Sequence, residues 1–241
     1  MDTKLTGKTR IESDLIGARE IPAEALYGVQ TLRGIENFSI SKFRLSEYPL
    51  FIKGLAITKM AAAMANFELG LLTVEQKDAI IAACGEILDG KHHDQFPVDM
   101  IQGGAGTTTN MNANEVIANR ALELMGHERG EYQYCSPNDH VNCSQSTNDA
   151  YPTAIHIGMY FKHLQLLPHL EELIASFRKK GEEFSQIIKM GRTQLEDAVP
   201  MTLGQTFNGF ASILQDEIAH LNEAAADFLV VNMGATAIGT G

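Results

Sequence analysis

The second half of the chain is dominated by two long apolar stripes with helical spacing. The first recurs every three, four or seven residues, at Ile155, Met159, Leu166, Leu170, Leu173, Phe177, Phe184 and Ile188. The second follows Pro200, at Leu203, Phe207, Phe210, Leu214, Ile218, Leu221, Ala225 and Phe228. Each stripe predicts one long amphipathic helix. Pro200 suits the first position of the second helix, whereas Pro168 predicts a kink in the first.

Shorter helical patterns occupy the first half. Residues 50–69 and 112–125 each carry a pattern that predicts a helix. Residues 73–76 read Thr-Val-Glu-Gln, a capping box that would open another helix, and Gly90 would end it. Residues 1–50 contain only turn and short-element signals. We therefore expect a mainly α fold.

The domain organisation follows from these lengths. We expect a small N-terminal domain over residues 1–147 and the start of a long-helix bundle over residues 148–241. The apolar stripes of the two long helices must be covered, and the chain has few other helices to cover them. An intramolecular hairpin of the two helices would cover part of each stripe. The packing argument favours partner subunits, and hence a homo-oligomer.

Composition and charge narrow the class of protein. The 241 residues are 44% hydrophobic and 20% charged, as in ordinary globular proteins, and the formal net charge of −11 disfavours nucleic acid as a partner. No run approaches the ~20 apolar residues of a membrane span, and no secretory signal is visible, so we expect no membrane partner. The three cysteines include no Cys-x-x-Cys pair, which favours a cytoplasmic protein without a zinc site or disulfide framework.

Three polar segments interrupt the helical pattern. Residues 103–110 read Gly-Gly-Ala-Gly-Thr-Thr-Thr-Asn, in which glycines and a following helix N-terminus would suit an anion. The segment is neither a P-loop nor a dinucleotide fingerprint, and a Gly-rich turn with a Thr or Asn cap explains it equally well. In residues 144–149, five of six positions are Ser, Thr, Asn or Asp, more than one helix cap needs. That excess favours a ligand such as a carboxylate.

The third polar segment, residues 189–197, lies between the two long helices. It is also explained as a simple helix–helix connection, with Arg192 as a salt-bridging surface residue.

Taken together, the polar segments resemble the signature regions of the aspartase/fumarase superfamily in the same order. The matching motifs are Gly-Glu-Tyr-Gln-Tyr at 130–134, Pro-Asn-Asp-His-Val-Asn at 137–142, Gln-Ser-Thr-Asn-Asp-Ala-Tyr-Pro-Thr at 145–153 and Lys-Met-Gly-Arg-Thr-Gln-Leu at 189–195. They are most similar to the aspartate ammonia-lyases. Class II fumarases are the nearest alternative, but they more usually have Asp at the position of His140 and His at that of Gln194.

The resemblance implies a fold, a reaction and an assembly. The fold would be aspartase/fumarase-like, with part of a long-helix central bundle. The reaction would be the reversible β-elimination of ammonia from L-aspartate to give fumarate, without a metal or organic cofactor. Members of the family are homotetramers in which each active site combines residues of three subunits.

The resemblance also implies residue roles. Thr107 would bind one substrate carboxylate, whereas the other carboxylate and the amino group would be held by Ser146, Thr147 and Asn148. The pocket would be completed from another subunit by Thr193, with Gln194 beside it. Arg33 and Lys59 match basic positions of the family to which we assign no role.

The general base of the family is a serine in a Gly-Ser-Ser loop followed by Met-Pro and Lys. The 241 residues contain no Gly-Ser-Ser. We therefore expect this chain alone to be inactive, with the base beyond Gly241. A different class of function is a non-catalytic helical assembly module that pairs with a separate C-terminal half.

Overall fold

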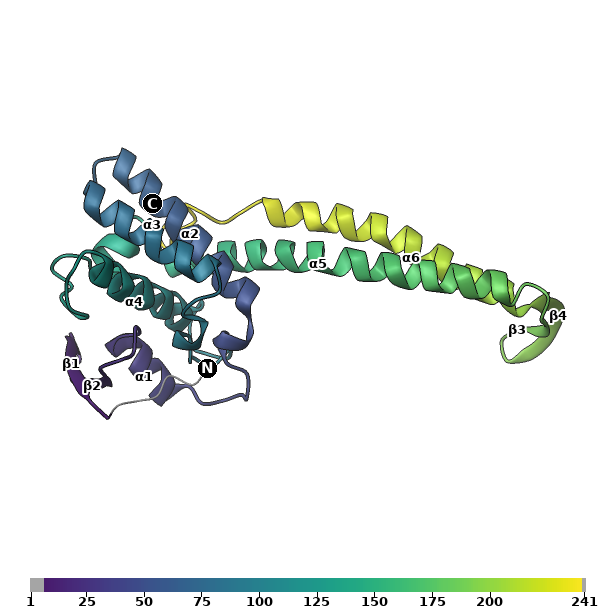
Figure 1. Ribbon diagram of the computed structural model, residues 1–241, viewed down its shortest axis with the longest axis horizontal. Helices are drawn as coiled ribbons and strands as arrows, with labels where there is room; N and C mark the ends of the chain where they lie inside the picture. Colours follow the sequence, from purple (N-terminus) through teal and green to yellow (C-terminus); the bar gives the residue numbers. More distant parts are fainter. Residues whose placement is uncertain (1–6, 240–241) are drawn as a thin grey trace. The chain divides into compact units, whose positions relative to one another are not determined.

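A computed structural model describes residues 7–239 of the chain (Figure 1). These residues form two compact units. The first comprises the described residues up to Met159 together with the segment from Val231, and the second comprises Tyr160–Val230. The division into domains at residues 147 and 148 stays a prediction.

The first unit is built mainly from helices. Its elements are β1 (Thr9–Asp14), β2 (Gly17–Pro22), α1 (Val29–Asn37), α2 (Pro49–Glu68), α3 (Val74–Leu88), α4 (Thr107–Leu124) and the first residues of α5 (Thr147–Glu183). Short 3₁₀ turns lie at Leu45–Glu47 and His93–Gln95, and a π-helix lies at Pro137–Val141. β1 and β2 form an antiparallel hairpin in which Thr9 pairs with Pro22. The predicted mainly α fold is confirmed.

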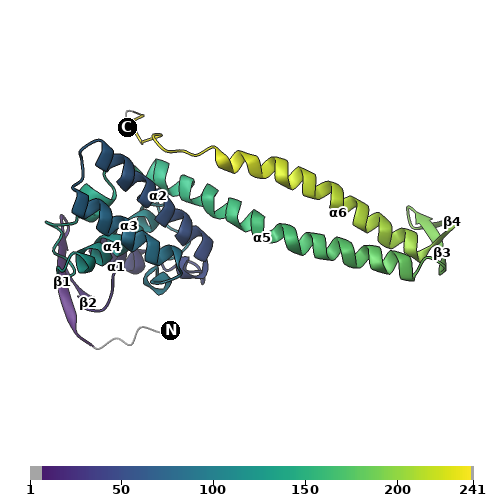
Figure 2. The same ribbon diagram turned by 45° about the horizontal axis from the view of Figure 1, so that its top comes forward.

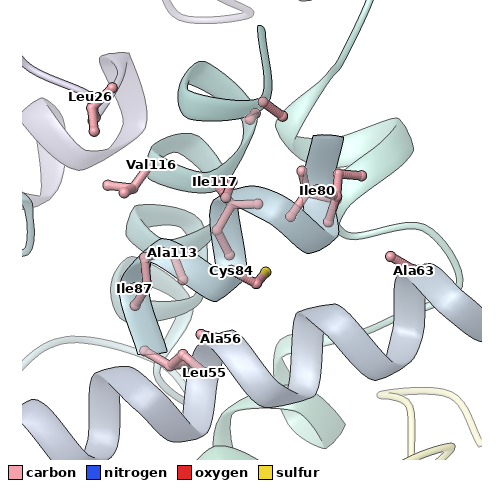
Figure 3. Close-up of a cluster of buried hydrophobic side chains, with 14 of the residues drawn as sticks. Leu26, Leu55, Ala56, Ala63, Ile80, Cys84, Ile87, Ala113, Val116 and Ile117 are labelled. Carbon is pink, nitrogen blue, oxygen red and sulfur yellow. The ribbon is translucent and has the colours of Figure 1, made fainter. Parts of the chain in front are cut away.

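The core of the first unit lies between α2, α3 and α4. Figure 3 shows Leu55 of α2, Cys84 and Ile87 of α3, and Ile117 of α4 among the side chains that fill it, and all four are completely or almost completely buried. The predicted capping box that opens α3 is confirmed, because the Thr73 hydroxyl accepts the Gln76 N–H while the Gln76 side chain accepts the Thr73 N–H. The core thus fixes the helices from which the candidate site is built.

By length and composition alone, α2 could cross a membrane, and among the described residues it is the helix that passes this test. From the sequence we expected no apolar stretch of this length. In the structure, α2 has a core-helix pattern: it contributes Ile52 and Leu55 to the apolar cluster and also carries a fully buried lysine, Lys59.

α4 begins earlier than its apolar pattern indicates. The predicted start was residue 112, but the helix begins at Thr107, directly after Gly106. Gly106 has φ 89°, a left-handed conformation in which glycine is favoured. The periodicity missed the first turn because its residues, Thr107–Asn110, are all polar, although Thr109 and Asn110 are buried.

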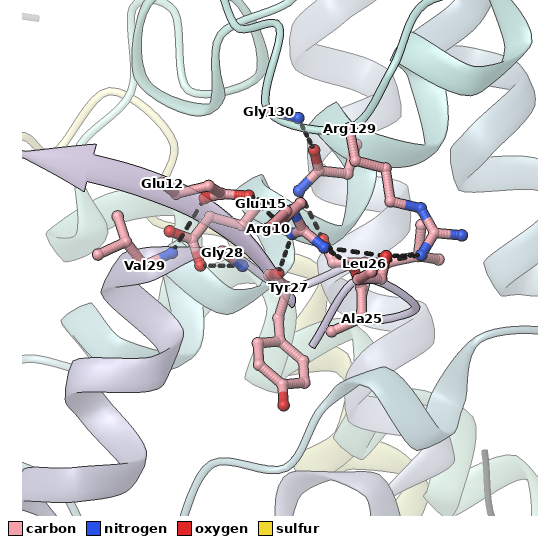
Figure 4. Close-up of polar contacts among 12 residues, drawn as sticks. Arg10, Glu12, Ala25, Leu26, Tyr27, Gly28, Val29, Glu115, Arg129 and Gly130 are labelled. Carbon is pink, nitrogen blue, oxygen red and sulfur yellow. Dashed lines mark hydrogen bonds and ion pairs between the residues drawn. The ribbon is translucent and has the colours of Figure 1, made fainter. Parts of the chain in front are cut away.

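A buried polar cluster attaches the β1–β2 hairpin and α1 to α4 (Figure 4). The carboxylate of Glu115, on α4, accepts hydrogen bonds from the backbone N–H groups of Gly28, Gln30 and Thr31 and from the Thr31 hydroxyl. Burial raises the pKa of Glu115, and these donors oppose that effect. Because the donors lie in the first turn of α1, the carboxylate acts as its N-terminal cap from another helix.

Arg33 also helps to attach α1 to the β1–β2 hairpin. Its guanidinium makes two hydrogen bonds of 2.9 Å to the carboxylate of Asp14 at the end of β1. This bidentate pair lowers the pKa of Asp14. Arg33 therefore connects α1 to the β1–β2 hairpin.

The second unit contains the rest of α5, the hairpin β3 (Ile188–Thr193) and β4 (Glu196–Thr202), and α6 (Leu203–Ala226) with a 3₁₀ turn at Asp227–Leu229. Figure 2 shows α5 and α6 side by side. Phe177 of α5 and Phe184, the residue directly after this helix, make ring contacts with Phe207 of α6. The hairpin of long helices weighed above is therefore present. It leaves large apolar side chains exposed, among them Leu164, Leu166, Leu173, Phe210 and Ile213. The oligomer stays a prediction.

The predicted start of the second long helix is wrong. Pro200 lies in β4, where it pairs with Met190 of β3. α6 begins at Leu203, because the Thr202 hydroxyl accepts the Gln205 N–H and the Gln205 side chain accepts the Thr202 N–H. A capping box thus determines this boundary, and the proline does not.

Candidate functional site

Two helix N-termini of the first unit lie together. Thr107 is the first residue of α4 and Thr147 is the first residue of α5. The two helices are joined by Asn110, whose side-chain amide donates to the Thr147 hydroxyl at 3.2 Å. Close packing also fixes the start of α5, because a side chain at Gly54 of α2 would collide with the carbonyl oxygen of Ala154. The arrangement places hydroxyls and helix N-termini, which favour anions, next to each other.

A hollow of about 500 Å³ opens between the Gly-rich segment and the start of α5. Its lining residues are Met100, Ile101, Gln102, Gly104, Ala105, Gly106, Asn148, Tyr151 and Pro152. A side chain at Gly106 would collide with the ring of Tyr151, so the glycine lets the backbone pass close to this ring. The exposed residues Thr107 and Asn148 lie in these two segments and carry a hydroxyl and an amide. Such donors could hold a carboxylate.

Part of the polar excess at residues 144–149 is a helix cap. The Ser146 hydroxyl accepts the Asn148 N–H at 3.2 Å, and the carboxylate of Asp149 accepts the Ser146 N–H at 2.9 Å. Asp149 is fully buried and also accepts the Gly234 N–H at 3.2 Å. Cap formation therefore accounts for Ser146 and Asp149 within the free chain. The substrate-binding role of Ser146 stays a prediction.

Sequence reasoning missed the residues that support this segment. The side chains of Asn142 and Gln145 accept hydrogen bonds from the ammonium nitrogen of Lys59, at 2.8 and 3.0 Å. Two asparagines of α4, Asn110 and Asn114, also donate to the Asn142 oxygen. The signal that could have found this network is a lysine within the apolar pattern of α2, since a lysine on a buried face needs polar partners.

Thr193 and Gln194 lie in the second unit, at the turn between β3 and β4. Thr193 pairs with Glu196, so Gln194 and Leu195 form a two-residue turn with φ of 49° and 72°. Both side chains of the predicted pair, Thr193 and Gln194, are exposed. Arg192 is exposed too and lies 3.4 Å from Asp197, consistent with the surface salt bridge considered above.

Among residues 7–239, no group of three or more His, Cys, Asp or Glu side chains is placed to hold a metal ion. The expectation that the reaction needs no metal and no organic cofactor stays a prediction.

Comparison with known proteins identifies the family. Residues 17–241 match the model of a protein family described as "Lyase". The chain belongs to this lyase family. Its relatives include the aspartate ammonia-lyases of Escherichia coli K12, 56% identical over 98% of this chain, and of Pseudomonas canavaninivorans, 58% identical over 96%. The chain spans only about half the length of these relatives, 50% and 49% respectively, and matches their N-terminal portion.

Solved structures of the lyase family share this fold. A fumarate lyase:delta crystallin from Brucella melitensis, bound to cobalt, matches with a TM-score of 0.94 and 54% identity over 97% of this chain and 51% of the other. A class II fumarase from Schistosoma mansoni matches with a TM-score of 0.89 and 38% identity over 97% and 49%. The predicted aspartase/fumarase-like fold is thereby confirmed.

Proposed function

We propose that this chain forms part of an ammonia-lyase that interconverts L-aspartate with fumarate and ammonia. The observation that carries the proposal is the joining of the N-termini of α4 and α5, where Thr107 and Asn148 expose a hydroxyl and an amide and Asn148 lines the adjoining hollow. A dicarboxylate substrate needs such neutral donors, because they bind anionic oxygens without burying a full positive charge. The identity of 56–58% to aspartate ammonia-lyases supports L-aspartate as the substrate.

The chemistry explains why donors matter more than charge. A base removes a proton from Cβ of L-aspartate, and the electron pair spreads into the adjacent carboxylate. This aci-carboxylate carries more negative charge on its oxygens than the ground state does. Donors held in place beforehand therefore stabilise it more than they stabilise the substrate. The Cα–N bond then breaks, and ammonia leaves as the double bond of fumarate forms.

The residue roles belong to the same proposal. Thr107 binds one carboxylate, while the other carboxylate and the amino group are held by Ser146, Thr147 and Asn148. Thr193 and Gln194, at the β3–β4 turn, complete the pocket from a neighbouring subunit of a homotetramer. The position of Thr193 and Gln194 on an exposed turn supports this assignment, since their side chains are available to another chain.

The base is not assigned to any of the 241 residues, which contain no Gly-Ser-Ser motif. We expect this chain alone to release no fumarate. Two alternatives make different predictions. A fumarate hydratase, favoured by the 38% identity to a class II fumarase, would produce fumarate from L-malate. A helical assembly module would bind a C-terminal half without turning over either substrate.

The test is reconstitution. The chain is assayed alone and after co-expression with the C-terminal half of the Escherichia coli aspartate ammonia-lyase, with L-aspartate and L-malate in parallel. Fumarate from L-aspartate in the assembled sample, and from neither substrate with the chain alone, is the expected result. Fumarate from L-malate alone would favour the hydratase. Co-assembly without turnover of either substrate would favour the module, and fumarate from the chain alone would overturn the assignment of the base.

A matched pair of variants tests the donor role in the assembled sample. Thr107→Val removes an exposed hydroxyl at nearly constant volume, and we expect kcat/KM for L-aspartate to fall on the order of 100-fold. Thr108→Val changes the next residue of α4, whose methyl group packs against Gly34, and should leave kcat/KM nearly unchanged. Equal effects of the two substitutions would contradict a specific role of Thr107.

A further inference from the structure

The most unusual charged group of the first unit is Lys59. It lies on α2 and is completely buried, although α2 is otherwise among the most apolar elements of the chain. Burying an ammonium group costs free energy unless the group is hydrogen-bonded, so a lysine at such a position needs polar partners that offset this cost. Burial lowers the pKa of Lys59 to about 7. Its two hydrogen-bonding partners, Asn142 and Gln145, are neutral amides, and the carboxylate of Asp149 only partly offsets the effect of burial on the pKa of Lys59.

Both partners belong to one tight turn, residues 142–146, which leads directly into α5. Inside the turn, the Gln145 N–H donates to the Asn142 carbonyl and the Asn142 side-chain amide donates to the Gln145 carbonyl. The Gln145 amide also donates to the carbonyls of Val141 and Cys143. Both amide groups of Asn142 and Gln145 are thus held by the backbone of the turn, and their oxygens point to Lys59.

The side chain of Asn142 connects the same turn to α4. The side-chain oxygen of Asn142 accepts hydrogen bonds from Lys59 at 2.8 Å, from Asn110 at 3.1 Å and from Asn114 at 3.2 Å. Asn110 additionally donates to the hydroxyl of Thr147. The ammonium group therefore lies at the centre of a network that joins α2, α4 and the N-terminus of α5.

We propose that Lys59 is a positioning residue for the candidate carboxylate site: by bridging Asn142 and Gln145 it fixes the turn that presents Ser146, Thr147 and Asn148. Lys59 itself is buried and does not contact substrate. The inference rests on the proposed function for the identity of the ligand, but the geometry of the turn is independent of it. If Lys59 only filled space in the core, replacing it would disturb the core as a whole. A positioning role instead means that replacing Lys59 loosens one turn while the core stays packed.

The first test uses amide hydrogen exchange of the whole 241-residue chain. In Lys59→Met, which keeps the length and apolar stem of the side chain, we expect exchange at residues 142–149 to accelerate at least about tenfold, while α3 is unaffected. In Lys59→Arg, which keeps donors to both amides, most of the protection should return. Lys53→Met, on the same helix and half-buried, is the control and should leave these residues unchanged. Equal acceleration throughout the first unit in Lys59→Met would overturn the proposal.

The second test uses turnover of L-aspartate by the chain assembled with a C-terminal half. In Lys59→Met, the looser turn would misplace the donors at residues 146–148 by a fraction of an ångström. We expect kcat/KM of this variant to fall on the order of 10- to 100-fold, mainly through kcat. Gln145→Leu removes one of the two acceptors from the opposite side, so it tests the same bridge if Lys59→Met does not fold. A double-mutant cycle between positions 59 and 145 should show coupling, whereas independent effects would contradict the bridge.

The two experiments separate two kinds of failure. If the assembled wild-type sample has no activity with L-aspartate, the proposed function fails, yet the exchange measurement still decides whether Lys59 fixes the turn. If the exchange pattern changes as expected and kcat/KM does not, the turn is held by Lys59 but does not position substrate donors, and the inference is overturned.

Discussion

The two compact units of the chain treat their apolar side chains in opposite ways. In the first, large residues such as Ile80, Ile117 and Leu122 are fully buried between three helices. In the second, the buried apolar residues among those described are Ile174, Ala211 and Ala225, while Leu173 and Ile213 are 42% and 61% exposed. A unit with a closed core carries its own stability, whereas a two-helix hairpin with open stripes depends on whatever covers them.

The same contrast applies to polar groups. In the first unit, Lys59 and Glu115 are buried and each has several hydrogen-bonding partners, Lys59 in the 142–146 turn and Glu115 at the N-terminus of α1. In the second unit, Arg192 and Asp197 are each about 70% exposed and form a salt bridge of 3.4 Å across the β3–β4 hairpin. Such an exposed pair contributes little to stability. The first unit, with its closed core, thus carries the candidate donors Thr107, Ser146, Thr147 and Asn148. The second unit carries Thr193 and Gln194, and its apolar faces would have to be covered by another chain.

The largest expected effect concerns Glu115. Replacing it by Gln places an amide N–H₂ group among N–H donors and leaves several of them without an acceptor. We expect the free energy of unfolding of the first unit to fall by at least about 3 kcal/mol, measured by urea denaturation. The control is Glu223→Gln on α6, an exposed carboxylate whose replacement should change stability by less than about 0.5 kcal/mol. Similar effects of both variants would remove the distinction between the units.

A second pair of variants compares apolar side chains directly. Ile117→Ala creates a cavity in the closed core and should cost about 2–5 kcal/mol. Leu173→Ala removes a partly exposed side chain and should cost less than about 1 kcal/mol in dilute monomer. Both are measured by denaturation at several protein concentrations. If the cost of Leu173→Ala rises with concentration, a partner chain covers this face, as expected for the homo-oligomer. A concentration-independent cost would contradict that cover.

A third prediction uses the titration of Lys59. Its pKa is about 7 in the folded chain and 10.5 when unperturbed. Between these pH values Lys59 is protonated in the unfolded chain and largely deprotonated in the folded chain. Stability must therefore rise with pH in this window, by up to about 1.4 kcal/mol for each pH unit, and this contribution must be constant below and above it. The side chains of Asp149 and Cys84 act on Lys59 electrostatically and favour its charged form.

The measurement is the free energy of unfolding of wild type and of Lys59→Met across this window. Other lysines, tyrosines and cysteines also titrate, so only the difference between the two proteins reports Lys59. A difference that increases with pH confirms the buried, deprotonating amine. A constant difference would mean that Lys59 keeps its ordinary pKa.

The sequence predicted the framework better than the site. Apolar periodicity located α2 and the long helices, and a capping box located the start of α3, because burial and caps leave local signals. The same method misplaced the start of α4, where the polar residues Thr109 and Asn110 are buried because they form hydrogen bonds with Gln102 and Thr147. It also assigned Pro200 to a helix, because a proline at N1 and a proline in a short hairpin strand look alike locally.

Within the candidate site, residue types indicated ligand binding at residues 144–149, but they could not distinguish the residues that support the turn from those that are exposed. Asn142 and Gln145 point to Lys59, which lies more than eighty positions earlier in the chain. Only the fold brings these side chains together. For Thr193 and Gln194 the limit is different, because the contact with another chain that we propose for them would not be visible in the structure of a single chain.

The smallest expected effect concerns the turn of the second unit. Gln194 and Leu195 have φ of 49° and 72°, and residues other than glycine and asparagine seldom adopt such values in a two-residue hairpin turn. Leu195 is 96% exposed, so the isolated chain gains little from its side chain. Leu195→Gly relieves the left-handed strain but adds freedom to the unfolded chain, and the net gain should be about 0.5–1 kcal/mol.

Thermal unfolding of the chain in dilute solution checks this gain, with Val199→Gly as the control. Val199 lies in β4 of the same hairpin, where glycine should lower stability by a similar amount. If Leu195→Gly stabilises the dilute chain but weakens its assembly or the turnover of the assembled enzyme, the strained leucine is retained for contact with another chain. If it weakens the dilute chain, the turn is held by interactions within the second unit, and the contrast between a self-contained first unit and a dependent second one fails at this point.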